Sequence, residues 1–133
     1  MEIRLLGPPE VLVGGRPLAV DTRKAVAILA LLAADGRPYA RDELAALLWP
    51  ESDGSAAHGA LRRTLSVMRG AIDGDALRID RVRVWLDAAL VQVDLVEVER
   101  LAARGARRDL AAAAALARGP FLAGFNLRDS PDF

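Results

Sequence analysis

Residues 58–72, HGALRRTLSVMRGAI, hold the pattern that decides the fold. A helix turns about 100° per residue, and four apolar side chains of this stretch then fall within one narrow arc: Leu61, Leu65, Met68 and Ile72. The opposite side carries small, polar and basic residues, with Arg69 at its border: Gly59, Arg62, Arg63, Ser66 and Gly70. The pattern predicts an amphipathic helix over 56–72 that begins near Ser55, its expected cap, and presents arginines outward.

Two further helices are predicted upstream. Residues 22–35, TRKAVAILALLAAD, are apolar around most of the helix circumference, which predicts a central, buried helix capped by Asp21 or Thr22. Residues 41–48, RDELAALL, form a short helix with acidic residues in its first turn, where the helix dipole favours them. The stretch WPESDGS at 49–55 has the composition of a loop.

The N-terminus predicts short strands. Residues 2–7 form one candidate, and 10–13 and 16–20 flank Gly14-Gly15. Both glycines tolerate the positive φ of a primed turn, so this pattern predicts a β-hairpin. A phosphate-binding loop is the other interpretation, but neither a Lys-Ser/Thr pair nor a helix follows the glycines.

A second hairpin is predicted after the arginine-bearing helix. Residues 76–80 and 82–87 alternate apolar and polar side chains around Asp80-Arg81. The apolar members are Leu77, Ile79, Val82, Val84 and Leu86. Three arginines lie on or beside the predicted turn: Arg78, Arg81 and Arg83.

The C-terminal part is predicted to be helical. DLVEVERLAARG at 94–105 and ARRDLAAAAALARG at 106–119 form two candidate helices separated by Gly105, an antiparallel pair of the kind found in helical repeats. Residues 121–133 are expected to be irregular. Together with the strands and helices before residue 90, this order predicts an α+β domain followed by the beginning of a truncated second domain.

Composition argues against catalysis. The chain has no cysteine and one histidine, His58, which we interpret as an exposed or cap-adjacent residue. Thiol chemistry is therefore excluded, and no metal site, cofactor or enzymatic activity is expected. The N-terminus resembles neither a signal peptide nor a membrane span, so a cytoplasmic protein without membrane contact is expected.

Basic residues are concentrated locally although the formal net charge is zero. The segment from Ser55 to Arg83 contains six arginines and three acidic residues, which leaves three positive charges. A solvated surface is one interpretation. The order of elements favours another, a helix-turn-helix with a β-hairpin wing, in which the arginine face lies in the major groove of DNA and the wing arginines reach phosphates or the minor groove.

Five stretches of the sequence support the second interpretation. GGRPLAVDTRKAVAILALLAADGRP and ARDELAALLWPES, followed by AAHGALRRTLSVMRGAI, resemble the OmpR-type winged helix of bacterial antibiotic regulatory proteins, the SARP family. VDLVEVERLAARG and ARGPFLAGF resemble the start of the TPR-like bacterial transcriptional activation domain that follows in that family. The resemblance implies a winged-helix DNA-binding domain over 1–90 and the beginning of an activation domain over 91–133.

The resemblance also implies partners and roles. SARP regulators bind direct repeats in promoter DNA and activate transcription. It implies that Arg62, Arg63, Ser66 and Arg69 form the DNA-binding face of the recognition helix, and that Arg78, Arg81 and Arg83 form that of the wing. The loop residues Glu51, Ser52 and Asp53 match a segment that contacts RNA polymerase in OmpR-type activators.

The recognition helix departs from the family at three positions. Val67 and Gly70 stand where arginines are usual, and Met68 replaces a core leucine. The loss of two cationic positions predicts low DNA affinity or binding as a homodimer. The alternative function is a protein-interaction module, a winged helix without DNA binding that acts through its helical C-terminal region.

Overall fold

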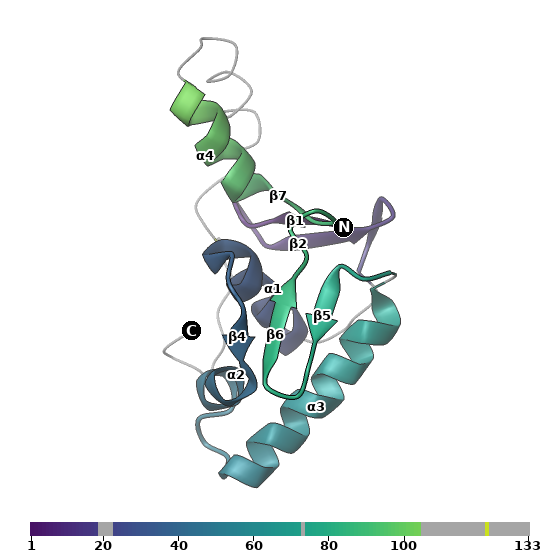
Figure 1. The fold of residues 1–133 in the computed structure, drawn as a ribbon, viewed down its shortest axis with the longest axis vertical. Helices are drawn as coiled ribbons and strands as arrows, with labels where there is room; N and C mark the ends of the chain where they lie inside the picture. Colours follow the sequence, from purple (N-terminus) through teal and green to yellow (C-terminus); the bar gives the residue numbers. More distant parts are fainter. Residues whose placement is uncertain (19–22, 73, 105–121, 123–133) are drawn as a thin grey trace.

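The computed structural model describes residues 1–18, 23–72, 74–104 and 122, and it shows an α+β fold (Figure 1). Two small sheets lie on either side of a central helix, and two more helices pack beside the second sheet. The expected caps Asp21 and Thr22, and the predicted helix after Gly105, lie outside the described residues. The predicted fold class is confirmed.

The first sheet has four strands in the order β3-β2-β1-β7. β1 (Glu2–Arg4), β2 (Glu10–Val13) and β3 (Arg16–Pro17) are antiparallel, and β7 (Gln92–Val93) pairs parallel with β1. Gly14 and Gly15 have φ of 59° and 78°, which confirms the predicted primed turn between β2 and β3. The sequence did not predict β7, which has only two residues.

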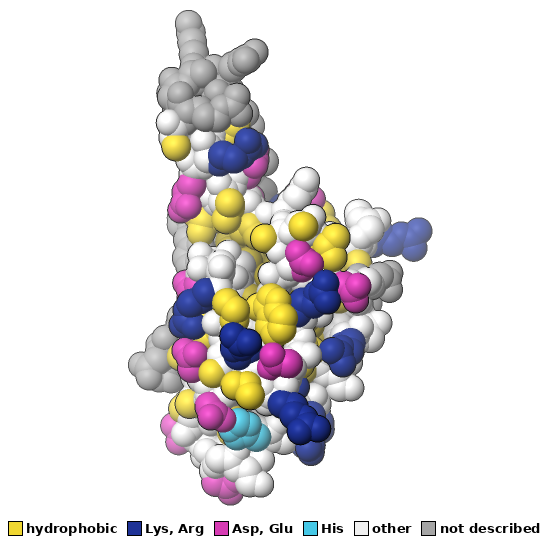
Figure 2. Space-filling view, in the orientation of Figure 1, with side chains coloured by type: hydrophobic (Ala, Val, Ile, Leu, Met, Phe, Trp, Pro, Cys, Tyr) yellow, Lys and Arg dark blue, Asp and Glu magenta, His cyan; other side chains and the backbone are white. Residues whose placement is uncertain are grey.

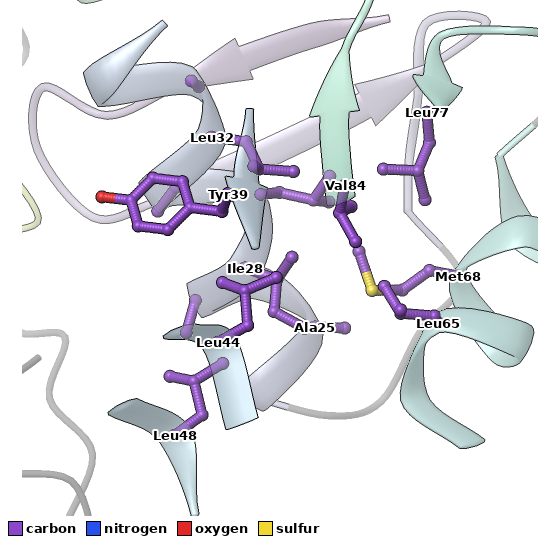
Figure 3. Close-up of a cluster of buried hydrophobic side chains, with 14 of the residues drawn as sticks. Ala25, Ile28, Leu32, Tyr39, Leu44, Leu48, Leu65, Met68, Leu77 and Val84 are labelled. Carbon is purple, nitrogen blue, oxygen red and sulfur yellow. The ribbon is translucent and has the colours of Figure 1, made fainter. Parts of the chain in front are cut away.

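Helix α1 (Arg23–Asp35) occupies the centre of the molecule, as its apolar circumference predicted. It contacts β1, α3 and β6, so that it bridges the two sheets. Ile28 and Leu29 are fully buried, and Leu32 is 2% exposed. Figure 3 shows Ala25, Ile28 and Leu32 facing side chains from the other helices and from the hairpin.

Helix α2 (Arg41–Leu48) has the predicted boundaries. Leu44 and Leu48 are fully buried, whereas Leu47 is half-buried. The Glu43 carboxylate accepts a hydrogen bond from the Ala40 N–H at 3.1 Å and stabilises the start of the helix. This bond lowers the pKa of Glu43, and the Arg37 guanidinium adds to the effect.

Helix α3 (Gly54–Ala71) buries the predicted apolar arc, and Leu61, Leu65 and Met68 are at most 2% exposed. Its predicted cap was wrong. The N-cap is Asp53, whose carboxylate accepts a hydrogen bond from the Ala56 N–H at 2.8 Å. A carboxylate one residue before the helix satisfies a free amide directly.

The second sheet contains the predicted wing hairpin, β5 (Leu77–Ile79) and β6 (Arg83–Leu86), and an unpredicted strand, β4 (Tyr39–Ala40). Its strands lie in the order β4-β6-β5, and both neighbouring pairs are antiparallel. Val84 is fully buried, whereas Val82, one of the apolar members of the predicted alternation, is 64% exposed at the turn. The inward face of the hairpin therefore ends before its tip.

Helix α4 (Asp94–Arg104) follows β7 directly and contacts β1 and β7. Asp94 is 7% exposed, and its carboxylate accepts hydrogen bonds from the Leu5 N–H at 2.7 Å and the Leu6 N–H at 3.1 Å. It also accepts one from the Leu95 N–H at 2.7 Å, within the first turn of α4. One buried carboxylate thus joins the end of β1 to the start of α4.

Candidate nucleic-acid interface

The outward face of α3 carries the four residues predicted to contact DNA. Arg62, Arg63, Ser66 and Arg69 are all exposed, opposite the side chains that α3 buries. Within the part of the chain that the structure describes, none of the three arginines has a hydrogen-bond or ion-pair partner. A Cβ on Gly59 would lie 3.4 Å from Arg63 Nη1, so the Arg63 guanidinium lies back along the helix over this glycine.

Gly70 and Val67 occupy the same outward side. Val67 is 55% exposed, and a Cβ placed on Gly70 would meet no atom within 4 Å. Neither residue is therefore required by packing. The two departures from the SARP pattern reduce the number of cations on this face without serving the core.

A carboxylate orders the tip of the wing. Asp80 accepts hydrogen bonds from the Val82 N–H at 2.8 Å and the Arg83 N–H at 2.6 Å, and its own N–H donates to the Arg83 carbonyl at 3.0 Å. The bonds from Arg83 and Val82 lower the pKa of Asp80 below its ordinary value. The tip is thus held in one shape by an acid whose Oδ1 accepts both backbone N–H groups.

The three wing arginines differ in their surroundings. Arg78 lies at the middle of β5 rather than at the tip, and it forms an ion pair with Asp87 at 3.3 Å. Arg83 lies 4.0 Å from Asp80, and its guanidinium carbon is 5.9 Å from the centre of the Trp85 ring. Arg81 is exposed at the turn and has no partner among the described residues. Arg81 is therefore the most available cation of the hairpin.

The wing tip is fixed next to the start of α2. The Arg41 N–H donates to the Val82 carbonyl at 2.8 Å, and Ala40 is opposite Arg83 in the β4–β6 pair. Figure 2 shows several separate dark-blue basic side chains on the face that carries the hairpin and α3, with magenta acidic and yellow hydrophobic side chains between them and the histidine in cyan nearby. The basic side chains therefore share one face of the molecule but are interspersed with acidic ones.

The loop between α2 and α3 holds the residues expected to contact RNA polymerase. Glu51 and Ser52 are exposed, and the Ser52 N–H donates to the Trp49 carbonyl at 3.2 Å. Asp53 is also exposed, but its carboxylate is used as the α3 cap. His58, the single histidine, lies on the first turns of α3 with Nε2 2.9 Å from an Asp42 carboxylate oxygen.

Two kinds of site are not found in the described parts of the chain. No group of three histidine, cysteine or acidic residues there is placed to hold a metal ion. Among the helices whose placement is described, none has the length and apolar character needed to cross a membrane.

The sequence did not identify Arg41 as a site residue. Its Nε is buried and lacks a hydrogen-bond partner in the described structure. In the sequence it appears only as the first residue of a short helix. Its position beside α3 and the wing depends on β4, a two-residue strand that carries no periodic signal.

The fold matches a solved protein closely. Neither a protein-family model nor a curated protein matches the sequence. Among solved structures, Mycobacterium tuberculosis EmbR in complex with a low affinity phosphopeptide is similar, with 28% sequence identity and a TM-score of 0.66. The match covers 91% of this chain and 37% of that chain, so the chain spans little more than a third of the length of EmbR. EmbR is a SARP-family regulator, and this likeness supports a winged-helix domain of the SARP type in the chain.

Proposed function

We propose that the chain is the DNA-binding part of a transcription regulator and that α3 is its recognition helix. The observation that carries this proposal is the row of exposed, partner-free arginines on the outer face of α3, Arg62, Arg63 and Arg69. A guanidinium that is already paired must give up that partner before it binds DNA. These three have no partner to give up among the described residues, and arginine donates two hydrogen bonds to guanine O6 and N7.

We assign each residue of α3 a base or a phosphate contact from its position on the helix. Arg62, Arg63 and Ser66 lie on the side opposite the buried arc, and we propose that they face base edges in the major groove. Arg69 lies in the last turn, where a phosphate contact is the expected role. A base contact by one arginine contributes about 1–3 kcal/mol of discrimination between bases.

The wing is assigned to the minor groove or the backbone. We expect Arg81, at the turn, to make the main DNA contact of the wing. Arg83, at the start of β6, should make a second contact beside it. Arg78 is paired with Asp87 and lies farther from the tip, so we expect it to contribute least. Because the chain as a whole is neutral, attraction to DNA depends on this local surface and is sensitive to salt.

Activation requires a second contact, which we assign to the α2–α3 loop. Glu51 and Ser52 are exposed in the loop that precedes α3, and we propose that they contact RNA polymerase at a promoter. Asp53 is the helix cap, so its replacement changes stability as well as any contact. Binding to direct repeats, and assembly as a homodimer on them, remain part of the proposal.

Fluorescence anisotropy with a labelled duplex of about 20 base pairs, two turns of B-DNA, tests the proposal. The logarithm of the binding constant should fall linearly with the logarithm of salt concentration between roughly 50 and 200 mM. The double variant Arg62→Ala/Arg63→Ala should lose sequence preference in a selection from random duplexes, whereas Arg16→Ala on β3 should retain it. No binding of the unaltered protein at low salt would overturn the DNA assignment in favour of a protein-interaction module.

A further inference from the structure

One large apolar side chain, Val67, lies on the arginine-bearing side of α3 and takes no part in the core. It is 55% exposed, and among the large apolar residues that the described structure leaves exposed it is the one on α3; the others are Val82, Leu90 and Val96. A single exposed valine is ordinary on a protein surface. What distinguishes Val67 is the set of side chains around it.

Val67 lies among the residues proposed above to face DNA. At about 100° per residue, it is about 40° around the helix from Arg63, one turn earlier, and on the other side of Arg63 from Arg62. Gly70 follows one turn later, where a Cβ would meet no atom within 4 Å. No side chain at position 70 therefore separates Val67 from a duplex that contacts Arg63.

The helix also fixes the direction of the Val67 side chain. Val67 lies inside α3, one turn before its last residue. A β-branched residue within a helix has one strongly preferred χ1 rotamer. The two methyl groups of Val67 are therefore held in one orientation before any ligand arrives, and their contact with a ligand costs little side-chain entropy.

The surroundings of Val67 indicate which ligand it meets. Arg62 and Arg63 are exposed without a partner among the described residues, so this face favours a polyanion. In the major groove of DNA, the C5-methyl group of thymine is the apolar group on the base edges. Guanine, cytosine and adenine present donors or acceptors there, and a valine that covers them displaces water without replacing its hydrogen bonds.

We propose that Val67 contacts the C5-methyl group of one thymine in the major groove and is a specificity-determining residue of α3. This inference rests on the proposed function. Residues three or four apart on a helix have Cβ atoms about 5–6 Å apart, and successive bases are about 3.4 Å apart. The thymine should therefore lie within about two base pairs of the base that Arg63 contacts.

Replacing thymine with deoxyuridine removes only this methyl group and leaves the hydrogen-bonding groups of the base unchanged. A selection from random duplexes gives the preferred sequence, and each thymine in it is then replaced singly. At one position, binding of the unaltered protein should weaken about three- to fivefold, the effect of one buried methyl group. Val67→Ala should bind both duplexes nearly equally. Val96→Ala, which truncates a 52% exposed valine on α4, should keep the full penalty.

A charged replacement at the same position gives an independent readout. Val67→Arg introduces a side chain that can donate two hydrogen bonds to guanine O6 and N7. In a selection, this variant should change the preferred base from thymine to guanine at that position alone, whereas Val67→Ala should show no preference there. The melting temperature of each variant checks that the fold is retained, which is expected for substitutions at an exposed position.

A duplex with 5-methylcytosine distinguishes the methyl group from the rest of the base, because 5-methylcytosine and thymine carry the same methyl group. At the position found with deoxyuridine, 5-methylcytosine should bind the unaltered protein about three- to fivefold more tightly than cytosine does. Val67→Ala should not distinguish the two. Tighter binding of 5-methylcytosine than of thymine would identify methylated cytosine as the ligand and overturn the assignment to thymine.

Two further results would contradict the inference while DNA binding itself stands. One is a series in which no deoxyuridine replacement weakens binding, or in which Val67→Ala keeps the penalty. The other is a loss of affinity in Val67→Ala that occurs only on duplexes with two copies of the preferred sequence, which would place Val67 against a neighbouring copy of the protein. Absence of binding by the unaltered protein would instead overturn the proposed function.

Discussion

Single residues at the termini of elements carry much of the specificity of this fold. The clearest is Asp94, a buried carboxylate that accepts hydrogen bonds from the Leu5 and Leu6 N–H groups. Replacing it with alanine leaves both donors without an acceptor, and we expect a loss of about 2–3 kcal/mol in the free energy of unfolding. Urea denaturation measures this loss. Asp94→Asn retains one acceptor oxygen and should lose less; equal stability of all three proteins would show that these bonds do not matter.

Gly70 permits a test of the missing cations at the residue scale. The position is exposed and a side chain meets no neighbour within 4 Å. Gly70→Arg should stabilise α3 by up to about 1 kcal/mol, because arginine is the better helix former. It should also steepen the salt dependence of DNA binding by about one phosphate contact. Gly70→Ala is the control: it should raise the melting temperature without changing the salt dependence of DNA binding. If Gly70→Arg and Gly70→Ala have the same salt dependence, residue 70 does not contact DNA.

At the scale of elements, the two faces of α3 should differ in how much stability is lost when a side chain is truncated. Met68 is fully buried, whereas its neighbour Val67 is 55% exposed. Met68→Ala should lower the free energy of unfolding by about 2–5 kcal/mol. Val67→Ala should change it by less than about 0.5 kcal/mol. Thermal unfolding of the two variants decides whether the faces are assigned correctly, and comparable losses would refute the assignment.

The wing hairpin should respond to acid through Asp80. Its folded-state pKa is lowered from 3.8 by hydrogen bonds from the Arg83 and Val82 N–H groups. The carboxylate therefore stabilises the hairpin above the pKa of the unfolded chain, and this contribution is lost as the pH falls through the lower, folded-state value. An NMR titration of the Asp80 carboxyl group should give a pKa below 3.8, and Asp80→Asn should remove the corresponding change in the amide signals of the tip. A value at or above 3.8 would show that the turn is not held in this way.

Elements with strong periodicity were predictable and short ones were not. The sequence predicted α1, α2 and the buried arc of α3, because apolar spacing that persists over two or more turns indicates which face of a helix is buried. It missed β4 and β7, since a two-residue strand has no period and depends on a distant partner. It placed the α3 cap at Ser55 instead of Asp53, because both residue types cap helices and only the fold decides between them.

In the candidate site, too, some features could be predicted from the sequence and others could not. Arginines on one face of α3 follow from helical spacing and could be identified from the sequence alone. The ion pair of Arg78 with Asp87 and the burial of Arg41 Nε could not, because each depends on residues that the pairing of strands brings together. The resemblance to SARP regulators supplied the overall arrangement but not these contacts.

For the whole molecule, the described structure continues past the predicted boundary at residue 90. β7 adds a parallel strand to β1, and Asp94 and α4 follow directly. A variant ending at residue 90 should therefore melt at least about 5 °C below one ending at residue 104, because it loses the strand pair and the Asp94 hydrogen bonds. Calorimetry compares the two; the same melting temperature would place the end of the folding unit at residue 90.

The central claim is that α3 and the wing tip together contact DNA. Amide chemical-shift mapping with a duplex of about 20 base pairs at low salt tests this claim most directly, because it follows the backbone N–H groups of both elements in one experiment. We predict shifts concentrated in residues 54–70 and at the tip around Arg81, with β2 and β3 unaffected. Shifts confined to the first sheet or to α4, or no shifts at all, would contradict the account.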